Sequence, residues 1–318
     1  MGRFTHSVST PQQTVTANTV SNFDLPVNPL SHLLIHLRCL NLTANTKATI
    51  ANLLATIDRL EVLYQNNPVI DLSGTDLHAL TLAILGRTTL QENVTNLENA
   101  VRTFTLVVPF GRKLYNPAEC FPATQRGNLI LRIDWAASFT NLDGLTVEIE
   151  AVELPGAAPT RFLRAAQLTA TPAATGDFDL TLPIGADLAA ILLFGTTIPT
   201  GTTDTKTINT VTLLQENESI FFHDVNWEVL HAQMGMWTNA DHHYDDHIHL
   251  ETATDTEGAE QDDGFLSTYA LMNFDPGRDD QFLLDTSGMG DLKIRFNIGV
   301  ASEAIRVIPI QLMATAGK

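Results

Sequence analysis

The sequence predicts an all-β protein with inserted short helices, built as two tandem β-sandwiches. Residues 127–134 (GNLILRID) and 290–297 (GDLKIRFN) share Gly, Leu and Arg at the same offsets, 163 positions apart in a chain of 318 residues. Both segments alternate apolar and polar residues, the period of a half-buried strand. Residues 103–112 and 267–278 match in the same way, upstream of the first pair. Many short strands with Gly and Pro turns, present in two copies, indicate two antiparallel sandwiches rather than a solenoid.

The predicted domains are an N-terminal arm at residues 1–22, a first sandwich at 23–157 and a second at 158–318. The arm is polar and has no core residues of its own. The boundary falls at 155–159 (PGAAP), where two prolines and a glycine interrupt the chain.

The first domain opens with a strand at 31–42 that places His32 and His36 on one face. Two histidines at this spacing share a metal only on a helix, so we interpret them as hydrogen-bonded or interface residues. Residues 45–65 have an apolar stripe at helical period and predict a helix. A second helix begins at Ser73, with Asp76 at the capping position, and ends near Gly86. Further strands are predicted at 69–72, 103–109, 128–135 and 145–154.

In the second domain, the short apolar run 187–194 is predicted to be a helix. Residues 224–263 hold eleven acids and no Lys or Arg, which predicts a long, exposed acidic excursion. Strands are predicted at 163–170, 178–182, 208–214, 219–223, 266–273, 290–297 and 304–312.

The charge of the chain is uneven and excludes some partners. The net charge is −18, with 13 acids and 10 bases in residues 1–159 but 23 acids and 8 bases in residues 160–318. Such an acidic chain repels phosphate backbones, so no direct nucleic-acid binding is expected. No apolar run approaches the ~20 residues of a membrane span. The N-terminus lacks a signal core, and Cys39 and Cys120 are expected to be buried, reduced thiols, which favours synthesis in a cytoplasm.

One constellation within the acidic excursion carries metal-binding residue types. If residues 246–252 are extended, His247, His249 and Glu251 share a face, as in a non-haem metal site. This resembles the cupin pattern, although cupins place three or four residues between the second His and the Glu, and this chain places one. Alternatively, Asp245, Asp246, Glu251 and Asp255 offer hard oxygen ligands for a structural divalent cation such as Ca²⁺. The third interpretation is a solvated acidic loop with no bound metal; no other cofactor is predicted.

Several segments together resemble a known family. They are DFDLTLPIG at 177–185, FDPGR at 274–278, LDTSG at 284–288, DLKIR at 291–295 and VIPIQL at 307–312. In pattern and order they resemble the double jelly-roll major capsid proteins of tailless icosahedral bacteriophages with an internal membrane (corticovirus-like and finnlakevirus-like). The first domain matches through 103–112 and 128–154.

The resemblance implies two tandem jelly rolls and no enzymatic activity. It further implies homotrimeric, pseudo-hexameric capsomers of an icosahedral shell, located in the virion. The partners it implies are copies of the same chain, minor or penton proteins, and the internal viral membrane near the N-terminal arm. The alternative is a two-domain cupin-like metalloenzyme that uses His247, His249 and Glu251. The two functions differ in whether this cluster converges inside a barrel mouth. A secreted glycan-binding module is disfavoured by the missing signal core.

Overall fold

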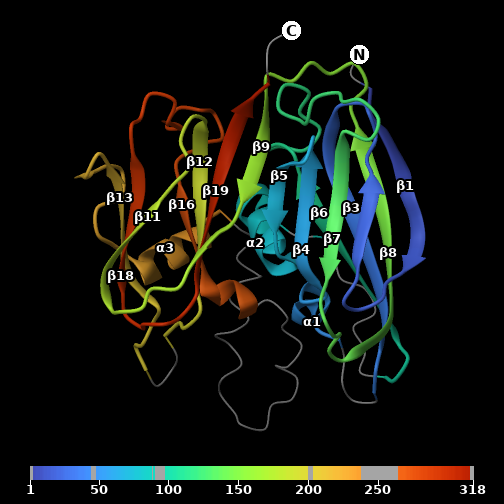
Figure 1. Ribbon diagram of the computed structural model, residues 1–318, viewed down its shortest axis with the longest axis horizontal. Coiled ribbons are helices and arrows are strands. Elements are labelled where there is room, and N and C mark those ends of the chain that lie inside the picture. The colour runs from blue at the N-terminus through green and yellow to red at the C-terminus, as the bar shows by residue number, and fades with distance from the viewer. Residues whose placement is uncertain are drawn as a thin grey trace. The chain divides into compact units, whose positions relative to one another are not determined.

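The structure is a computed structural model that describes residues 3–43, 48–87, 89, 97–199, 203–237 and 264–315. It contains two compact units, Met1–Arg164 with Ala314–Lys318 and Ala165–Met313 (Figure 1). Strand β9 (Arg161–Ala166) carries the chain from the first unit to the second. Among the residues that the structure describes, no helix is both long and apolar enough to cross a membrane.

The first unit consists of two antiparallel four-stranded sheets. One has the strand order β1-β8-β3-β6 and the other β2-β7-β4-β5. The inward-facing side chains of both sheets, such as Leu33, Ile35, Leu131 and Ile133, are fully buried. The elements are β1 (Thr5–Thr14), β2 (Val20–Asp24), β3 (Leu30–Asn41), α1 (Ile50–Leu54), β4 (Ile57–Tyr64), β5 (Asn67–Leu72), α2 (Gly74–Leu85), β6 (Val101–Pro109), β7 (Leu129–Trp135) and β8 (Leu142–Glu153).

The second unit repeats this arrangement. Its sheets have the orders β10-β19-β12-β16 and β11-β18-β13-β14, with β17 added to β12 and β15 added to β13. The elements are β10 (Leu168–Ala170), β11 (Gly176–Thr181), β12 (Asp187–Gly195), β13 (Ile208–Gln215), β14 (Glu218–Ser219), β15 (Val225–Asn226), α3 (Trp227–Met234), a 3₁₀ helix (Gly264–Thr268), β16 (Tyr269–Asn273), β17 (Leu284–Asp285), β18 (Leu292–Ile298) and β19 (Ile305–Ala314).

The strand orders make each unit a jelly roll. Numbered in sequence order, the strands of the first unit form the sheets 1-8-3-6 and 2-7-4-5, and the second unit follows the same scheme. Two four-stranded antiparallel sheets connected in this way are the jelly-roll arrangement. The repeated motif occupies the same position in both, on β7 and on β18. A helix also lies between the same two strands in each unit, α2 in the first and α3 in the second.

Helix α2 shows how the local sequence sets an element. Ser73 accepts a hydrogen bond from the Asp76 backbone N–H at 3.1 Å, which caps the N-terminus, and Gly86 ends the helix in the left-handed region at φ 73°. Ten of its twelve residues are buried, because the helix packs against β4, β5 and β6. The prediction of this helix from its capping residues is confirmed.

Two predicted helices are wrong. Residues 57–64 form β4 rather than the second half of a helix, because Leu60 and Val62 pack into the core from a strand that pairs with β5 and β7. The apolar run at 187–194 is β12, a central strand between β16 and β19. A short apolar run with both faces covered has the same composition in a strand as in a buried helix, and sheet pairing decides between them.

The predicted arm also needs correction. Thr5–Thr14 form β1, which pairs with β8, and Val20–Asp24 form β2, which pairs with β7. Both are edge strands whose side chains are mostly exposed, so their polar composition is that of a surface segment. The backbone hydrogen bonds that hold them in the sheets leave no trace in composition.

Candidate interaction surfaces

The predicted metal-binding residues Asp245, Asp246, His247, His249 and Glu251 lie outside the residues that the structure describes. Their arrangement therefore remains a prediction. Within the described ranges, no group of three or more His, Cys, Asp or Glu side chains is placed to hold a metal ion.

The start of the predicted acidic excursion is not an exposed loop. Residues 224–237 include β15 and α3, and α3 buries Trp227, Leu230 and Met234 against the second jelly roll. The acids of this segment lie on the surface of a packed element, which is why the prediction of a fully exposed excursion is wrong here.

The other sequence-predicted residues behave as expected. His32 Nδ1 lies 3.0 Å from Ser31 Oγ, and His36 Nδ1 lies 3.0 Å from Thr105 Oγ1, so both rings have hydrogen-bond partners on strands. Cys39 and Cys120 are free and buried. Burial raises the pKa of each thiol to about 11, which keeps both thiols protonated and unreactive.

A buried ion pair organises the loop between β6 and β7. Glu119 is only 3% exposed, and its carboxylate accepts hydrogen bonds from the backbone N–H and the guanidinium of Arg112 and from Arg161 at 2.9 Å. Burial opposes ionisation, but the bonds from Arg112 outweigh it and hold the pKa of Glu119 below its ordinary value. Gly111 is required beside this pair, because a Cβ there would lie 2.3 Å from the Glu119 carbonyl oxygen. The pair ties the loop to the start of β9.

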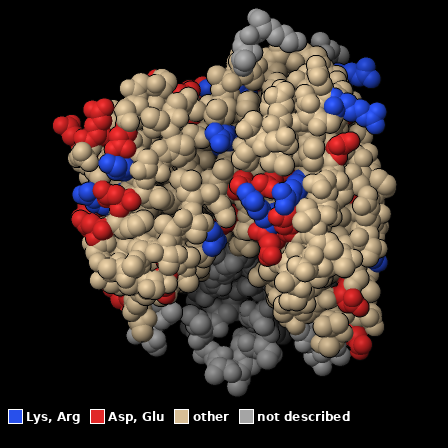
Figure 2. All heavy atoms as spheres, in the orientation of Figure 1, with Lys and Arg blue, Asp and Glu red and all other residues tan. Residues whose placement is uncertain are grey.

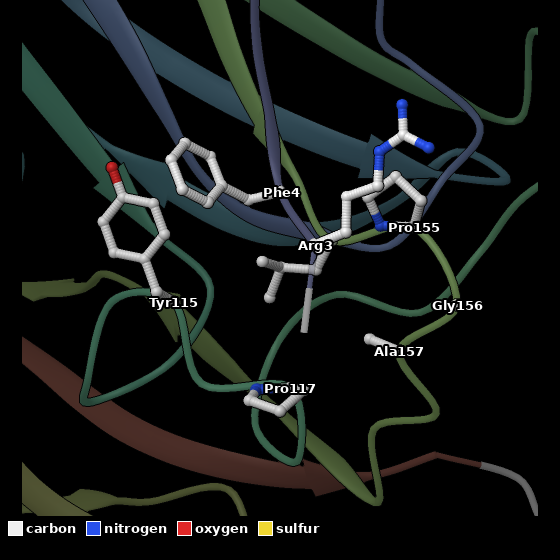
Figure 3. Close-up of a pocket in the computed structure, with 8 residues that line it drawn as sticks. Arg3, Phe4, Tyr115, Pro117, Pro155, Gly156 and Ala157 are labelled. Carbon is white, nitrogen blue, oxygen red and sulfur yellow. The ribbon is translucent and has the colours of Figure 1, made fainter. Parts of the chain in front are cut away.

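The same loop forms one wall of a pocket of about 400 Å³, which we call the N-terminal pocket (Figure 3). In Figure 3, Phe4 and Tyr115 lie across the pocket from Pro155, Gly156 and Ala157. The rings of Phe4 and Tyr115 meet edge to face, with their centroids 5.2 Å apart. Phe4 is nevertheless 57% exposed and Tyr115 46% exposed. The remaining lining residues are Arg3, Pro117 and Leu154. A cavity of this size, with aromatic and proline walls and a cation, is the general form of a binding site.

Tyr115 is held in an unusual backbone conformation. Its φ is 62°, a region that bulky side chains rarely adopt. Its backbone N–H donates to Ser31 Oγ at 2.7 Å, and its ring packs edge-on against His32 at 5.3 Å. Tyr115 is therefore held in place by its contacts with β3, while its ring remains open to the pocket.

His32 itself lies in a row of titratable groups on the outer face of the β1-β8-β3-β6 sheet. His6 on β1 and His32 on β3 flank Val152 of β8, and His6 Nε2 lies 2.6 Å from the Glu150 carboxylate. Burial, with a smaller contribution from His6, lowers the pKa of His32 to about 4. The imidazole is therefore neutral at neutral pH.

Each jelly roll carries a charged network on its second sheet. In the first unit, Arg59 makes two hydrogen bonds to Asp71 at 2.7 and 2.8 Å, and Glu61 accepts from Arg59 at 2.9 Å. Arg132 lies 3.0 Å from Asp134 and 3.5 Å from Glu61. Figure 2 shows this mixture of red and blue over β4, β5 and β7. The network is held within the sheet, so its charges largely neutralise one another.

The second unit has a matching network around Arg295. This guanidinium makes two hydrogen bonds to Asp179 at 2.6 and 2.8 Å, and Asn297 donates to Asp177 at 3.2 Å. The repeat alignment locates Arg132 and Arg295 correctly, but it gives no indication of their partners. Sequence reasoning missed the N-terminal pocket entirely, because Phe4 and Tyr115 are far apart in the chain and share no motif.

Comparison with known proteins shows which of them share this fold. Neither a family model nor a curated protein sequence matches the chain. Solved structures do. The major capsid protein of Sulfolobus turreted icosahedral virus (STIV) is 12% identical with a TM-score of 0.69, and the match covers 98% of this chain and 97% of that one.

Two further structures match over nearly their full lengths. The major capsid protein P2 of bacteriophage PM2 is 11% identical with a TM-score of 0.61, covering 100% of both chains. The PBCV-1 virus capsid is 10% identical with a TM-score of 0.62, covering 98% and 94%. The chain is a double jelly roll. The predicted fold class is confirmed, and at these identities the likeness is one of fold.

Proposed function

We propose that this chain is a viral major capsid protein, the structural subunit of an icosahedral shell. One observation carries the proposal. Both jelly rolls together match capsid subunits from end to end. The matches cover at least 98% of this chain and at least 94% of each of the three matched capsid chains. A match of only one jelly roll would leave many functions open, because single jelly rolls also occur in lectins and cupins.

The surface chemistry supports a structural role. Only 17% of the residues are charged, and many of the charged side chains on the sheets neutralise one another within one subunit. Surfaces that are buried in permanent assemblies are poor in unpaired charge.

We further propose that three copies form a pseudo-hexameric capsomer, since each copy supplies two jelly rolls of one topology. The remaining proposed partners are neighbouring capsomers, minor or penton proteins, and an internal membrane near the N-terminal residues. The narrower assignment, to tailless bacteriophages with an internal membrane, rests on the sequence resemblance. The fold itself does not favour that group, because it is similar to the capsid proteins of STIV, PM2 and PBCV-1 alike.

The experiment is to purify the full chain and measure its mass by light scattering, together with its metal content. A capsid subunit is expected to have three times the 34.7 kDa mass of the chain and no stoichiometric transition metal. A monomer with one tightly bound metal per chain, lost when His247, His249 and Glu251 are replaced by Ala, contradicts the proposal. That result would favour the cupin-like enzyme.

A further inference from the structure

A second exposed aromatic residue in an unusual conformation lies on the second jelly roll, in residues 216–224, which we call the Phe221 loop. Phe221 is 54% exposed and has φ 56°. Its ring touches Phe274 edge-on at 5.6 Å, while the neighbouring Phe222 packs against the same ring at 5.5 Å. An exposed phenylalanine held at positive φ is costly for an isolated subunit, and such residues concentrate at binding sites.

The Phe221 loop is anchored to β13 on both sides of Phe221. The Ile220 N–H donates to the Leu213 carbonyl at 2.9 Å, and the Leu213 N–H donates to the Phe222 carbonyl at 3.0 Å. The Asp224 N–H donates to Thr212 Oγ1 at 3.0 Å. The loop therefore presents Phe221 from a fixed backbone, which reduces the entropy lost when it binds a partner.

The charge of the loop is uniformly negative. Glu216, Glu218 and Asp224 are exposed, and residues 216–224 contain no Lys or Arg. An apolar side chain among carboxylates fits a partner that offers an apolar hollow with a cation beside it.

The N-terminal pocket on the first jelly roll has this complementary chemistry. Phe4, Tyr115, Pro117 and Pro155 supply apolar walls, and Arg3 extends beside Pro155 in Figure 3. Arg3 is exposed and makes no ion pair with any residue that the structure describes. The acids next to the lining residues are buried: Glu119 is neutralised by Arg112 and Arg161, and Glu153, beside Leu154, is 8% exposed and accepts a hydrogen bond from Asn28 at 2.7 Å.

We propose that the Phe221 loop of one copy of the chain docks into the N-terminal pocket of a second copy, with Phe221 in the hollow and Glu218 beside Arg3. The proposal rests on the proposed function, in which copies of the chain pack together. The Phe221 loop and the N-terminal pocket lie on different jelly rolls of each chain, so the contact is heterologous, and repeating it forms a ring where the rotation between successive copies closes.

Site-specific cross-linking between copies tests the contact. Ala157→Cys in the pocket and Phe221→Cys in the loop are placed in separately tagged full-length chains that are produced together and oxidised. The native thiols do not interfere, because both are buried with raised pKa values. A disulfide-linked heterodimer is expected only from this pairing. The control pairs Ala157→Cys with Phe282→Cys, which is also exposed on the second unit.

Substitutions test the energetics of the same contact. Asn accepts positive φ, so Phe221→Asn removes the aromatic side chain without straining the loop. We expect this substitution to weaken self-association about tenfold or more. Arg3→Glu places two acids together and is expected to weaken association, while Arg3→Glu with Glu218→Arg restores it. Phe282→Ser is the matched control that leaves association unchanged.

The outcomes separate this contact from the proposed function. If the chain forms trimers or shells but Phe221→Asn associates like the wild type, the docking proposal is overturned and the capsid function stands. A cross-link of equal yield in the Phe282→Cys control also overturns it, as does a wild-type chain that stays monomeric. If Arg3→Glu abolishes binding to anionic lipid vesicles and the cross-link is absent, the pocket serves a membrane instead.

Discussion

The two jelly rolls place one shared arginine at the same point of the same sheet and use it differently. On β7, Arg132 joins Asp134 of its own strand and Glu61 of β4. On β18, the position of Asp134 is occupied by Asn297, and Thr212 faces Arg295 from β13. Arg295 therefore turns to the other side and binds Asp179 of the edge strand β11.

This difference teaches that sheet position and partner choice are separate properties. The position follows from the alternating pattern, which both copies keep. The partner follows from which neighbouring strand carries the acid: Glu61 on β4 in the first unit and Asp179 on β11 in the second. In the first unit the arginine ties central strands together, and in the second it fastens an edge strand, where unpaired backbone groups are most in need of protection.

The largest expected effect separates the units by their buried charges. The first unit has a buried ion pair at Glu119, whereas the Asp179 pair of the second unit is exposed. Glu119→Gln leaves Arg112 buried without its counter-charge and is expected to lower the free energy of unfolding by about 3–5 kcal/mol. Asp179→Asn, the matched control, is expected to change it by less than ~1 kcal/mol. Urea unfolding of both variants measures this, and equal losses would contradict the distinction.

The second effect is a dependence of the first unit on pH. His32 has a pKa of about 4, below the 6.5 of an unfolded chain, so the unfolded state takes up the proton first as the pH falls. The contribution of neutral His32 to the free energy of unfolding is complete above about pH 6.5. It is lost progressively as the pH falls towards 4, by ~3 kcal/mol in all. His32→Asn is expected to flatten this part of the stability profile.

Urea unfolding of the wild type and of His32→Asn at a series of pH values between about 7 and 4 measures this effect. A wild-type profile that is flat between pH 6.5 and 4, or a His32→Asn profile as steep as the wild type, would show that His32 does not govern the acid response.

The third effect concerns backbone approach. Gly111→Ala forces the backbone of the loop away from the Glu119 carbonyl and is expected to destabilise the protein by about 1–3 kcal/mol. Gly288 in the second unit has open space around it, so Gly288→Ala is the matched control and should be close to neutral. Thermal unfolding of the two variants decides the point, and a neutral Gly111→Ala would contradict the close approach.

The smallest effect returns to the shared arginine. Arg132→Gln removes one of two cations beside Glu61, which is largely buried, and is expected to cost about 1 kcal/mol. Arg295→Gln removes an exposed pair and should give an unfolding midpoint indistinguishable from the wild type, above all in high salt. A larger loss at Arg295 than at Arg132 would reverse the comparison.

Local patterns predicted the elements whose formation is decided locally. The alternation on β7 and β18, and the capping residues Ser73 and Gly86 of α2, are properties of a few adjacent residues. The repeat between the two halves then gave the doubling of the fold. Each of these survives in the structure because tertiary packing reinforces it.

The remainder depends on neighbours that are distant in sequence. Apolar residues of β12 face neighbours on both sides of the sheet, so no alternation marks that strand. The polar strand β1 is defined by its hydrogen bonds to β8. In the N-terminal pocket, Phe4 contacts Tyr115, which is distant in the sequence, and the two residues share no motif that would predict this contact. The predicted metal residues at 245–251 lie outside the described residues.

The most direct test of the central claim is electron microscopy of the purified, full-length chain in its native oligomer. If each chain contributes two equivalent jelly rolls to a shell unit, averaged views along the symmetry axis will show three copies arranged as six similar lobes in a near-hexagonal outline. A single chain in isolation, or a threefold particle with only three lobes, would contradict the account of this protein as a capsid subunit.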